Sequence, residues 1–353
     1  MIRVLITGCS MHSNDLIDVL RDNYDGEEIY VVGINCSDTA LLRKGVDARY
    51  VVPKIDDPAY EDTLLEICKK EHVDVVLPFI TAELPVAIRY KDRFEKEGIK
   101  VSVTDEQSLK AVGNKLMLSE KYPGLMPMQK VISGSADMDA GGVLRKTYEV
   151  YQFASAIGYP DKKFCCKLPN RCGGLGFAIV DEKKGNDLSL YNKFGLNRYI
   201  TMNTLLSLLH HCDETVILQE YEDGVDYSMC VLADHGKMLF ALGFEASLMS
   251  YGSAMFAKIS QNEQALKIAE KITKESGLDG NACFDFMVKS DGSVKLLEVN
   301  PRVSATLPFI AKAGLNLPYL RLRQLLGADM SKYKPEINYR LRMSKNYESE
   351  YFE

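Results

Sequence analysis

Residues 283–302 read CFDFMVKSDGSVKLLEVNPR, two β-forming runs that meet at Asp291-Gly292. An Asp-Gly pair between such runs is a strong local signal for a β-hairpin. If this pair is the centre of the turn, Asp285 lies directly opposite Glu298, and Asn300 projects from the same face two residues further on. The segment therefore predicts a hairpin that brings two carboxylates and an amide together.

Two facing carboxylates need a partner, because like charges opposed on a sheet are destabilising. Two carboxylates and an amide oxygen suit a hard ion such as Mg²⁺, which keeps its other positions for water and nucleotide phosphate. Arg302 follows the second run and offers a guanidinium fork for phosphate oxygens. The alternative is a solvated acidic face in which Arg302 pairs with one acid. Both interpretations stay open here, because a longer turn would shift the register.

A second signal lies at residues 163–176, KFCCKLPNRCGGLG. The segment predicts a strand that ends at Lys167 and runs into a glycine-rich loop. A lysine and bare backbone amides that converge in this way suit a phosphate group. No Gly-Lys-Ser/Thr follows, so this is not a P-loop, and an ordinary glycine-rich turn is the alternative.

A third signal lies at residues 217–228, ILQEYEDGVDYS, where a strand passes through an acidic turn into another strand. Backbone groups at such a crossing can bind an adenine edge while carboxylates hold ribose hydroxyls. An acidic solvated loop is the alternative.

The first hundred residues alternate β-forming runs with amphipathic segments, a pattern that predicts a parallel sheet flanked by helices. The expected strands are Arg3–Thr7, Ile29–Ile34, Val73–Phe79 and Ile99–Val103. The loop after the first strand contains one glycine, Gly8, whereas a dinucleotide-binding fold needs three spaced glycines. A nicotinamide-dependent oxidoreductase is therefore not expected.

The later chain predicts further elements and one mobile loop. We expect helices over Tyr148–Ile157 and over Glu263–Ser276, the latter ended by Gly277, and strands over Tyr227–Leu232 and Met238–Gly243. The mobile-loop candidate is Ser133–Gly142.

Composition excludes several classes of protein. The chain has 353 residues, enough for two or three domains, and its formal charge of −6 disfavours nucleic-acid binding. No apolar run reaches the length of a membrane span, and the N-terminus does not resemble a signal peptide. The nine cysteines form no C-x-x-C pair, so neither a zinc site nor a disulfide framework is expected. We expect reduced thiols and a cytoplasmic location.

Taken together, these motifs resemble the ATP-grasp superfamily, and in particular the ATP-binding halves of the carbamoyl-phosphate synthase large subunit. The order agrees along nearly the whole chain: Asn114-Lys115, then Lys167 with its glycine loop, then Gln219-Glu220-Tyr221, then LLEVNPR. The stretch from Asn300 to Pro318, NPRVSATLPFIAKAGLNLP, is especially similar.

The resemblance implies an α/β and α+β architecture. It consists of a parallel-sheet pre-ATP-grasp domain (1–112), a small ATP-grasp subdomain with a glycine-rich lid loop (113–222) and a large subdomain with the metal-binding hairpin (223–353). It also implies roles for individual residues. The residues that would bind ATP are Lys115, Lys167, Gly173, Gly174, Gly176, Glu220, Tyr221, Glu222 and Asp226. Those that would hold Mg²⁺ are Asp285, Glu298 and Asn300, and Arg302 would act on the phosphates.

Family chemistry implies an ATP-dependent ligase. A small-molecule carboxylate is activated as an acyl phosphate and coupled to an amine or similar nucleophile, without a covalent protein intermediate; a homodimer is a reasonable expectation. Many relatives carry an arginine where this chain has Glu245, which motivates an alternative, a non-catalytic or regulatory module that binds ATP and Mg²⁺. The identities of the substrates cannot be deduced from the sequence.

Overall fold

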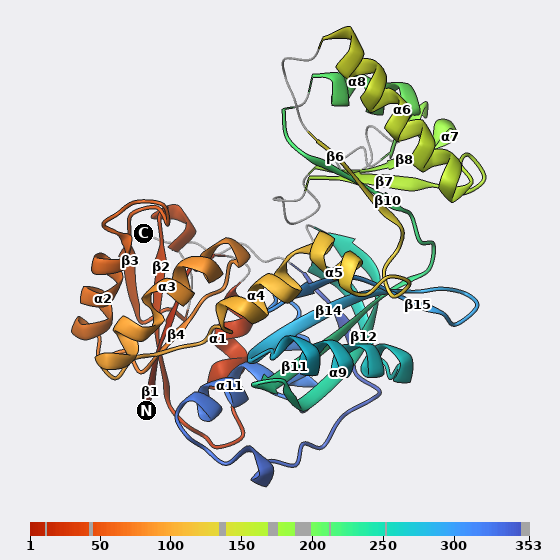
Figure 1. Ribbon diagram of the computed structural model, residues 1–353. Coiled ribbons are helices and arrows are strands. Elements are labelled where there is room, and N and C mark those ends of the chain that lie inside the picture. The colour runs from red at the N-terminus through yellow and green to blue at the C-terminus, as the bar shows by residue number, and fades with distance from the viewer. Residues whose placement is uncertain are drawn as a thin grey trace.

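The computed structural model contains three β-sheets in three lobes (Figure 1). It describes residues 1–10, 13–41, 45–133, 139–168, 176–187, 199–211, 213–250 and 253–346. We refer to the lobes as N-terminal, middle and large. In Figure 1 the N-terminal lobe lies at the left, the middle lobe at the upper right and the large lobe below it.

The N-terminal lobe is a parallel five-stranded sheet in the order β3-β2-β1-β4-β5. Its central strands are almost fully buried because helices cover both faces of such a sheet. The strands are β1 (Ile2–Ile6), β2 (Ile29–Asn35), β3 (Ala48–Val51), β4 (Val75–Leu77) and β5 (Lys100–Val101). The helices are α1 (Asn14–Arg21), α2 (Tyr60–Lys70) and α3 (Leu84–Lys96).

The middle lobe is a five-stranded sheet in the order β6-β10-β7-β8-β9. Helices α6 and α8 cover the face turned away from the large lobe (Figure 1). The strands are β6 (Gln129–Ile132), β7 (Phe164–Lys167), β8 (Phe177–Val180), β9 (Tyr199–Ile200) and β10 (Val216–Glu220). The helices are α6 (Ala140–Ile157), α7 (Glu182–Gly185) and α8 (Met202–His210).

The large lobe is an antiparallel six-stranded sheet in the order β15-β14-β11-β12-β13-β16. Its strands are β11 (Val225–Asp234), β12 (Lys237–Ser250), β13 (Ser253–Ile259), β14 (Gly280–Val288), β15 (Val294–Asn300) and β16 (Arg342–Ser344). The associated helices are α4 (Glu106–Gly113), α5 (Lys115–Lys121), α9 (Glu263–Ser276), α10 (Leu307–Lys312) and α11 (Leu317–Leu325). No helix within the described residues is long and apolar enough to span a lipid bilayer.

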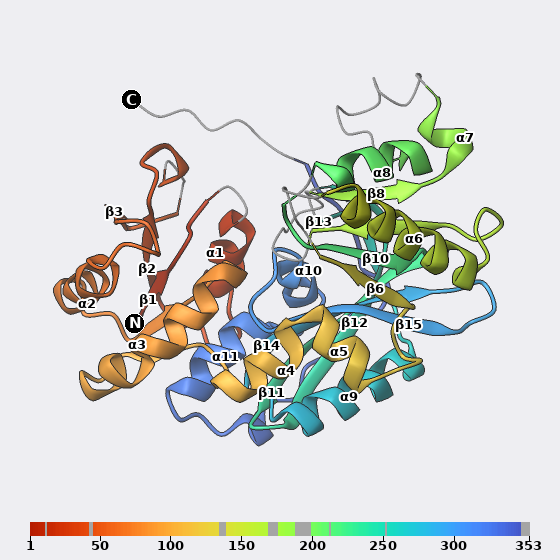
Figure 2. The ribbon, with the colours of Figure 1, turned by 45° about the horizontal axis from the view of Figure 1, so that its top comes forward.

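The apolar core joins two of the three lobes. One cluster of buried residues runs from β1 and α1 through α10 and α11 onto one face of the six-stranded sheet, and α9 covers the other face together with α4 and α5 (Figure 2). The buried side chains of the middle lobe form a separate cluster. The N-terminal and large lobes therefore share a core, whereas the middle lobe has its own.

Most predicted elements are present, with shifted ends. Helix α9 has the predicted bounds, and Gly277 ends it in the left-handed conformation that glycine adopts without strain. Strand β3 was not predicted. The prediction of a mobile loop over Ser133–Gly142 is wrong at its end, because residues 140–142 begin α6 and the Asp139 side chain caps this helix. Residues 134–138 of the predicted loop lie outside the described residues.

The packing of α5 differs from the proposed start of the small subdomain at residue 113. Helix α5, which we assigned to the small subdomain, packs through Leu118 against the core of the six-stranded sheet, as do Tyr122 and Met126. The chain enters the middle lobe only at β6 and leaves it after β10. We therefore propose that the small subdomain begins near Gln129.

A buried ion pair within the large lobe also contacts the end of the N-terminal lobe. The guanidinium of Arg321 is 1% exposed, forms a two-fold contact with Asp279 at 3.0 and 2.7 Å, and donates through Nε to Ser102 Oγ at 3.3 Å. We expect Asp279→Ala to lower the free energy of unfolding by about 3–5 kcal/mol, because it leaves a buried charge without its partner. Urea unfolding followed by circular dichroism measures the change.

Glu106→Ala is the control for this prediction. It removes an exposed ion pair with Lys110 on the surface of α4, and should change the free energy of unfolding by less than about 0.5 kcal/mol. Equal effects of the two substitutions would contradict a structural role for the buried pair.

Candidate active site

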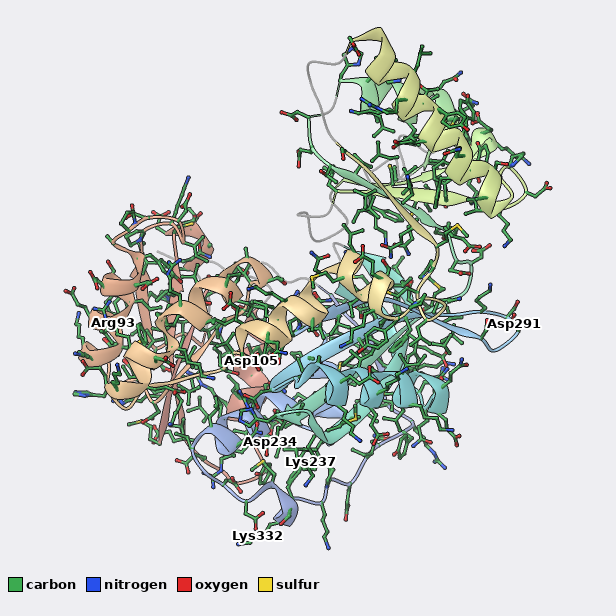
Figure 3. All side chains as sticks on the ribbon, viewed as in Figure 1. Arg93, Asp105, Asp234, Lys237, Asp291 and Lys332 are labelled. Carbon is green, nitrogen blue, oxygen red and sulfur yellow. The ribbon has the colours of Figure 1, made fainter. Side chains whose placement is uncertain are left out.

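The hairpin of β14 and β15 is present, but its turn is longer than predicted. Val288 pairs with Val294, so the turn is centred on Asp291, which lies at the outer tip of the hairpin (Figure 3). This turn alone would put Asp285 opposite Leu297. A β-bulge skips Leu297 and brings Glu298 opposite Asp285. The predicted pairing is confirmed, although the predicted turn was wrong.

Among the three predicted metal ligands, Asn300 lies within hydrogen-bond distance of both acids. Asn300 Nδ2 donates to Asp285 Oδ2 at 3.0 Å and to Glu298 Oε1 at 3.1 Å. Ser228, on the neighbouring strand β11, donates its hydroxyl to Asp285 Oδ1 at 2.7 Å. Hydrogen bonds from within the hairpin and from the neighbouring strand β11 thus hold the carboxylates in place.

The two carboxylates have very different proton affinities. Burial and the charge of Glu298 raise the pKa of Asp285 to about 6. Burial also disfavours the ionised form of Glu298, but the ammonium of Lys115 outweighs it and lowers the pKa of Glu298 to about 2. At neutral pH both groups are ionised, and Asp285 forms no ion pair with any described residue.

This donor set fits a hard divalent cation such as Mg²⁺. Carboxylate oxygens are its preferred ligands, and a half-turn of the Asn300 amide would present Oδ1 where Nδ2 now points. A cation between Asp285 and Glu298 would also remove the repulsion that raises the pKa of Asp285. These three residues are the ones that would hold the ion.

Lys115 is positioned by a capped helix start. The side chain of Asn114 accepts hydrogen bonds from the backbone N–H groups of Leu116 and Met117, so Lys115 is the first residue of α5. Its ammonium forms an ion pair with Glu298. The structure therefore places Lys115 beside the carboxylate pair.

Lys167 reaches the same region from the middle lobe. It ends β7 on the face away from α6 and α8, and its ammonium donates to Gln219 Oε1 at 2.8 Å. Burial lowers the pKa of Lys167, and the charges of Lys115 and Glu298 also act on it. The two lysines and the carboxylate pair thus form one charged cluster between two lobes.

Only the end of the glycine-rich loop is described. Gly176 has φ +69°, and its carbonyl accepts the N–H of Leu168 at 3.2 Å, which closes the base of the loop. A Cβ at this position would lie 2.7 Å from Leu168 Cδ1. Gly173 and Gly174 lie outside the described residues.

The segment between β10 and β11 contains the residues expected to bind the adenosine. The carboxylate of Glu220 forms an ion pair with Lys162 at 3.2 Å, and that of Glu222, which is 5% exposed, forms one with Lys289 at 3.0 Å. Tyr221 donates its backbone N–H to Lys163 O at 3.0 Å. Both carboxylates thus have cationic partners, and the assignment of this segment to the adenine stays a prediction.

Asp226 lies next along the chain, near the start of β11. It pairs with Ala246 on one side and with Met287 on the other. Its register places it on the same face of the sheet as Ser228 and Asp285. Its assignment to the ribose stays a prediction.

Arg302 lies between the carboxylate pair and the N-terminal lobe. Its Nε donates to Thr81 Oγ1 at 3.0 Å and one terminal nitrogen donates to Val303 O at 3.0 Å. Its charge acts on Asp285, where it opposes the rise in pKa. The guanidinium thus stands beside the predicted metal ligands, as a phosphate-binding group would.

Sequence reasoning missed two residues of this region, Ser228 and Gln219, as partners of Asp285 and Lys167. Both could have been found from strand alternation once the neighbouring strands were known, because each shares a face with the group it contacts. The sequence does not reveal which strands are neighbours.

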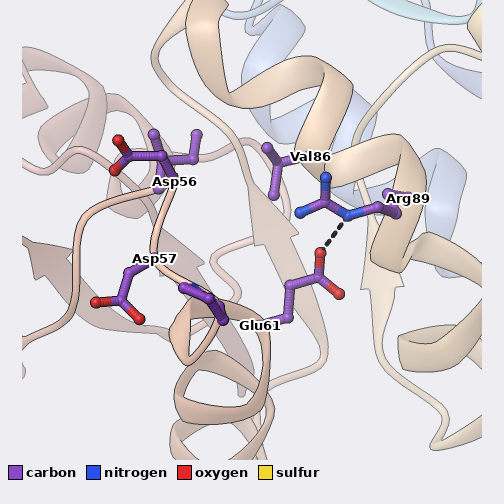
Figure 4. A pocket seen from close by; sticks show the side chains of 7 residues that line it. Asp56, Asp57, Glu61, Val86 and Arg89 are labelled. Atoms are coloured by element: carbon purple, nitrogen blue, oxygen red, sulfur yellow. Dashed lines mark hydrogen bonds and ion pairs between the residues drawn. The ribbon is translucent and has the colours of Figure 1, made fainter.

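Two cavities lie outside this cluster. One, of about 310 Å³, lies on the N-terminal lobe among acidic side chains, where Arg89 donates to Glu61 at 2.5 Å (Figure 4). The other, of about 600 Å³, lies along β12, β13 and β16. Neither is lined by a residue of the carboxylate pair.

Two family models match separate parts of the chain. Residues 4–102 match the PylC-like N-terminal domain, and residues 212–348 match "ATP-grasp in the biosynthetic pathway with Ter operon". The two matches cover the sheet of the N-terminal lobe and all six strands of the large lobe.

The carbamoyl phosphate synthase large chain of Buchnera aphidicola is 24% identical over 320 residues, which is 90% of this chain and 27% of that protein. The chain thus spans about a quarter of the length of this curated relative. Among solved structures, the biotin carboxylase domain of 2-oxoglutarate carboxylase from Hydrogenobacter thermophilus, in complex with MgADP, has a TM-score of 0.64 at 16% identity. The alignment covers 96% of this chain and 73% of that one.

An L-amino acid ligase from Bacillus licheniformis also has a TM-score of 0.64, at 15% identity, with 96% of this chain and 78% of that chain covered. The family match places an ATP-grasp region at residues 212–348, and the fold of nearly the whole chain is similar to those of these two enzymes. Its N-terminal lobe matches the PylC-like N-terminal domain, and over most of its length the chain is similar to part of a carbamoyl phosphate synthase large chain.

The opposite pKa shifts of the carboxylate pair predict opposite effects of neutralising each acid. The raised pKa of Asp285 means that it favours folding below about pH 4 and loses this contribution as the pH rises through about 6. The lowered pKa of Glu298 means that it favours folding above about pH 4.5 and loses this contribution only as the pH falls toward about 2.

At pH 7.5 without divalent metal, we therefore expect Asp285→Asn to stabilise the protein by about 1–2 kcal/mol and Glu298→Gln to destabilise it by a similar amount. Chemical denaturation in EDTA measures both. Added Mg²⁺ should stabilise the wild type and neither variant. Shifts of the same sign for the two variants would refute this electrostatic assignment.

Proposed function

We propose that the protein is an ATP- and Mg²⁺-dependent ligase that activates a small-molecule carboxylate and couples it to an amine, with release of ADP and phosphate. The observation that carries the proposal is the convergence of Asp285, Glu298 and Asn300 with Lys115, Lys167 and Arg302. Three oxygen donors beside three cations suit a metal-bound triphosphate.

Each group has a distinct task in this proposal. Asp285, Glu298 and Asn300 would hold the cation, which would supply positive charge to neutralise the phosphates when bound. Lys167 and Lys115 neutralise the phosphates. For this, the ammonium of Lys115 must break its ion pair with Glu298. Arg302 binds the transferring phosphoryl group and the carboxylate that receives it.

The reaction then needs no protein nucleophile. A carboxylate oxygen of the substrate attacks the γ-phosphorus and ADP leaves, which gives an acyl phosphate. The lone pair of an amine attacks the acyl carbon, phosphate leaves, and the nitrogen loses a proton to give the amide. Positioning and charge neutralisation supply the catalysis.

The alternative is a module that binds ATP and Mg²⁺ without turnover, which Glu245 suggested. Glu245 pairs across the sheet with Tyr227, so it lies on the face opposite to Ser228 and Asp285. It also forms an ion pair with Lys258 at 2.8 Å and accepts the Ser260 hydroxyl at 2.7 Å. A side chain on that face does not point toward a reaction near Asp285. The position of Glu245 therefore supports the ligase over the non-catalytic module.

Nucleotide binding tests the first half of the proposal. We expect Lys167→Met to weaken binding of a non-hydrolysable ATP analogue with Mg²⁺ by about 10- to 100-fold, because a charge-assisted contact to phosphate is lost. Isothermal titration calorimetry measures this. Lys183→Met, which removes an exposed lysine of the same lobe, is the control and should bind as the wild type does. Unchanged binding by Lys167→Met would exclude Lys167 from the nucleotide site.

Turnover tests the second half. We expect Arg302→Gln to bind the same analogue within about threefold of the wild type but to release ADP at least about 100-fold more slowly in a screen of carboxylates and amines. If the wild type binds MgATP tightly but releases no ADP with any pair, the non-catalytic alternative is correct.

A further inference from the structure

A partly buried carboxylate lies at the carboxyl ends of β1 and β4, outside the cluster described above. Glu83 ends a short helix, η3 (Thr81–Glu83), that follows β4. In this sheet β2 and β4 flank β1, so the chain crosses to opposite sides of β1. In open parallel sheets, ligands bind at the carboxyl ends of the strands, at the place where the chain connections diverge to opposite sides.

The position of Glu83 is fixed by groups that all belong to this edge of the sheet. Its Oε2 accepts hydrogen bonds from the Thr7 hydroxyl and from the backbone N–H of Ile80 at 3.3 Å. Among the described residues, none donates a hydrogen bond to Oε1. One oxygen therefore holds the side chain in place and the other remains for a ligand.

Glu83 also lacks a cationic partner among the described residues. Burial raises its pKa, although the hydrogen bonds from Thr7 and from the backbone favour the ionised form. A positively charged group that approached Oε1 would stabilise the carboxylate. The chemistry of this place thus favours a ligand that carries a cation.

Gly8 keeps the surface over Glu83 open. Its φ is +56°, and a Cβ there would lie 2.3 Å from Ile80 Cδ1 and 3.6 Å from Glu83 Oε1. Any side chain at position 8 would collide with Ile80 and narrow the approach to the carboxylate. The backbone conformation and the space both require glycine here.

The same short helix contacts the candidate active site. Thr81, two residues before Glu83, accepts the hydrogen bond from Arg302 Nε at 3.0 Å. The shared apolar core holds the N-terminal and large lobes together, so the spacing between Glu83 and Arg302 is fixed by the fold. A carboxylate at the end of this short helix and a guanidinium that contacts its start suit a small molecule with a cation and an anion.

We propose that Glu83 binds the ammonium group of an amino-acid substrate whose carboxylate is directed to Arg302 for activation. This inference rests on the proposed ligase function and adds the class of the carboxylate substrate to it. The carboxylate of that substrate receives the phosphoryl group, and its ammonium stays bound at the N-terminal lobe. Glu83 is then a specificity-determining residue.

The test compares the proteinogenic amino acids with their deamino and N-acetyl analogues as carboxylate substrates, with ammonia and simple amines as acceptors. ADP release is measured in the wild type, Glu83→Gln and Glu71→Gln. Glutamine at position 83 keeps the acceptor for Thr7 and Ile80 but removes the charge. Glu71 accepts hydrogen bonds from Tyr30 and Tyr50 in the same lobe and serves as the matched control.

We expect at least one amino acid to be a substrate and its deamino analogue to be inactive. Glu83→Gln should raise the KM for the amino acid by about tenfold or more, with the KM for ATP unchanged and Glu71→Gln like the wild type. An unchanged KM for the amino acid in Glu83→Gln overturns the inference. So does equal activity with the deamino analogue, or turnover only with carboxylates that lack an amino group.

Binding separates failure of this inference from failure of the proposed function. If the wild type does not bind MgATP, the ligase function itself fails and the inference falls with it. If MgATP binds but no amino acid changes the melting temperature or releases ADP, the inference alone is wrong. A rise in melting temperature with an amino acid in the wild type, absent in Glu83→Gln, supports it independently of turnover.

Discussion

The repulsion between Asp285 and Glu298 is the constraint around which this structure is organised. Two acids that face each other across antiparallel strands destabilise the sheet by themselves, and they would not be placed there for stability. Several neighbours reduce that cost: Lys115 neutralises one acid, and Ser228 and Asn300 donate hydrogen bonds. Burial and the remaining repulsion together raise the pKa of Asp285, and this uncompensated charge is the feature that favours a cation.

The separation of the hydrophobic cores explains how this place can accept a nucleotide. The N-terminal and large lobes share one apolar cluster, so Arg302, Thr81 and the carboxylates form a fixed platform. Lys167 and Gln219 belong to the middle lobe, which has a core of its own. A lobe joined to the platform by two chain crossings and few shared side chains can approach or leave bound phosphates while its own core remains intact.

The sequence predicted which side chains gather at the site better than it predicted the local geometry that brings them together. Residue types and order pointed to the hairpin acids, Lys167 and Arg302, and the family resemblance added Lys115; these residues lie together. Helix α9 was predicted to the residue because its cap signals and its apolar period agree. The turn at Asp291 was wrong because Asp-Gly is compatible with several turn lengths, and the packing of α5 on the large lobe was missed because an amphipathic helix does not specify which sheet it covers.

The turn at Asp291 and the bulge at Leu297 are two irregularities that cancel. The first moves the register of the hairpin by one residue, and the second moves it back before Glu298 is reached. In the history of such a hairpin, a deletion in the turn alone would rotate Glu298 to the opposite face of the sheet and separate the two acids. Length changes at the tip are therefore tolerated only together with a compensating insertion or deletion near Leu297, so the two sites must change as a pair.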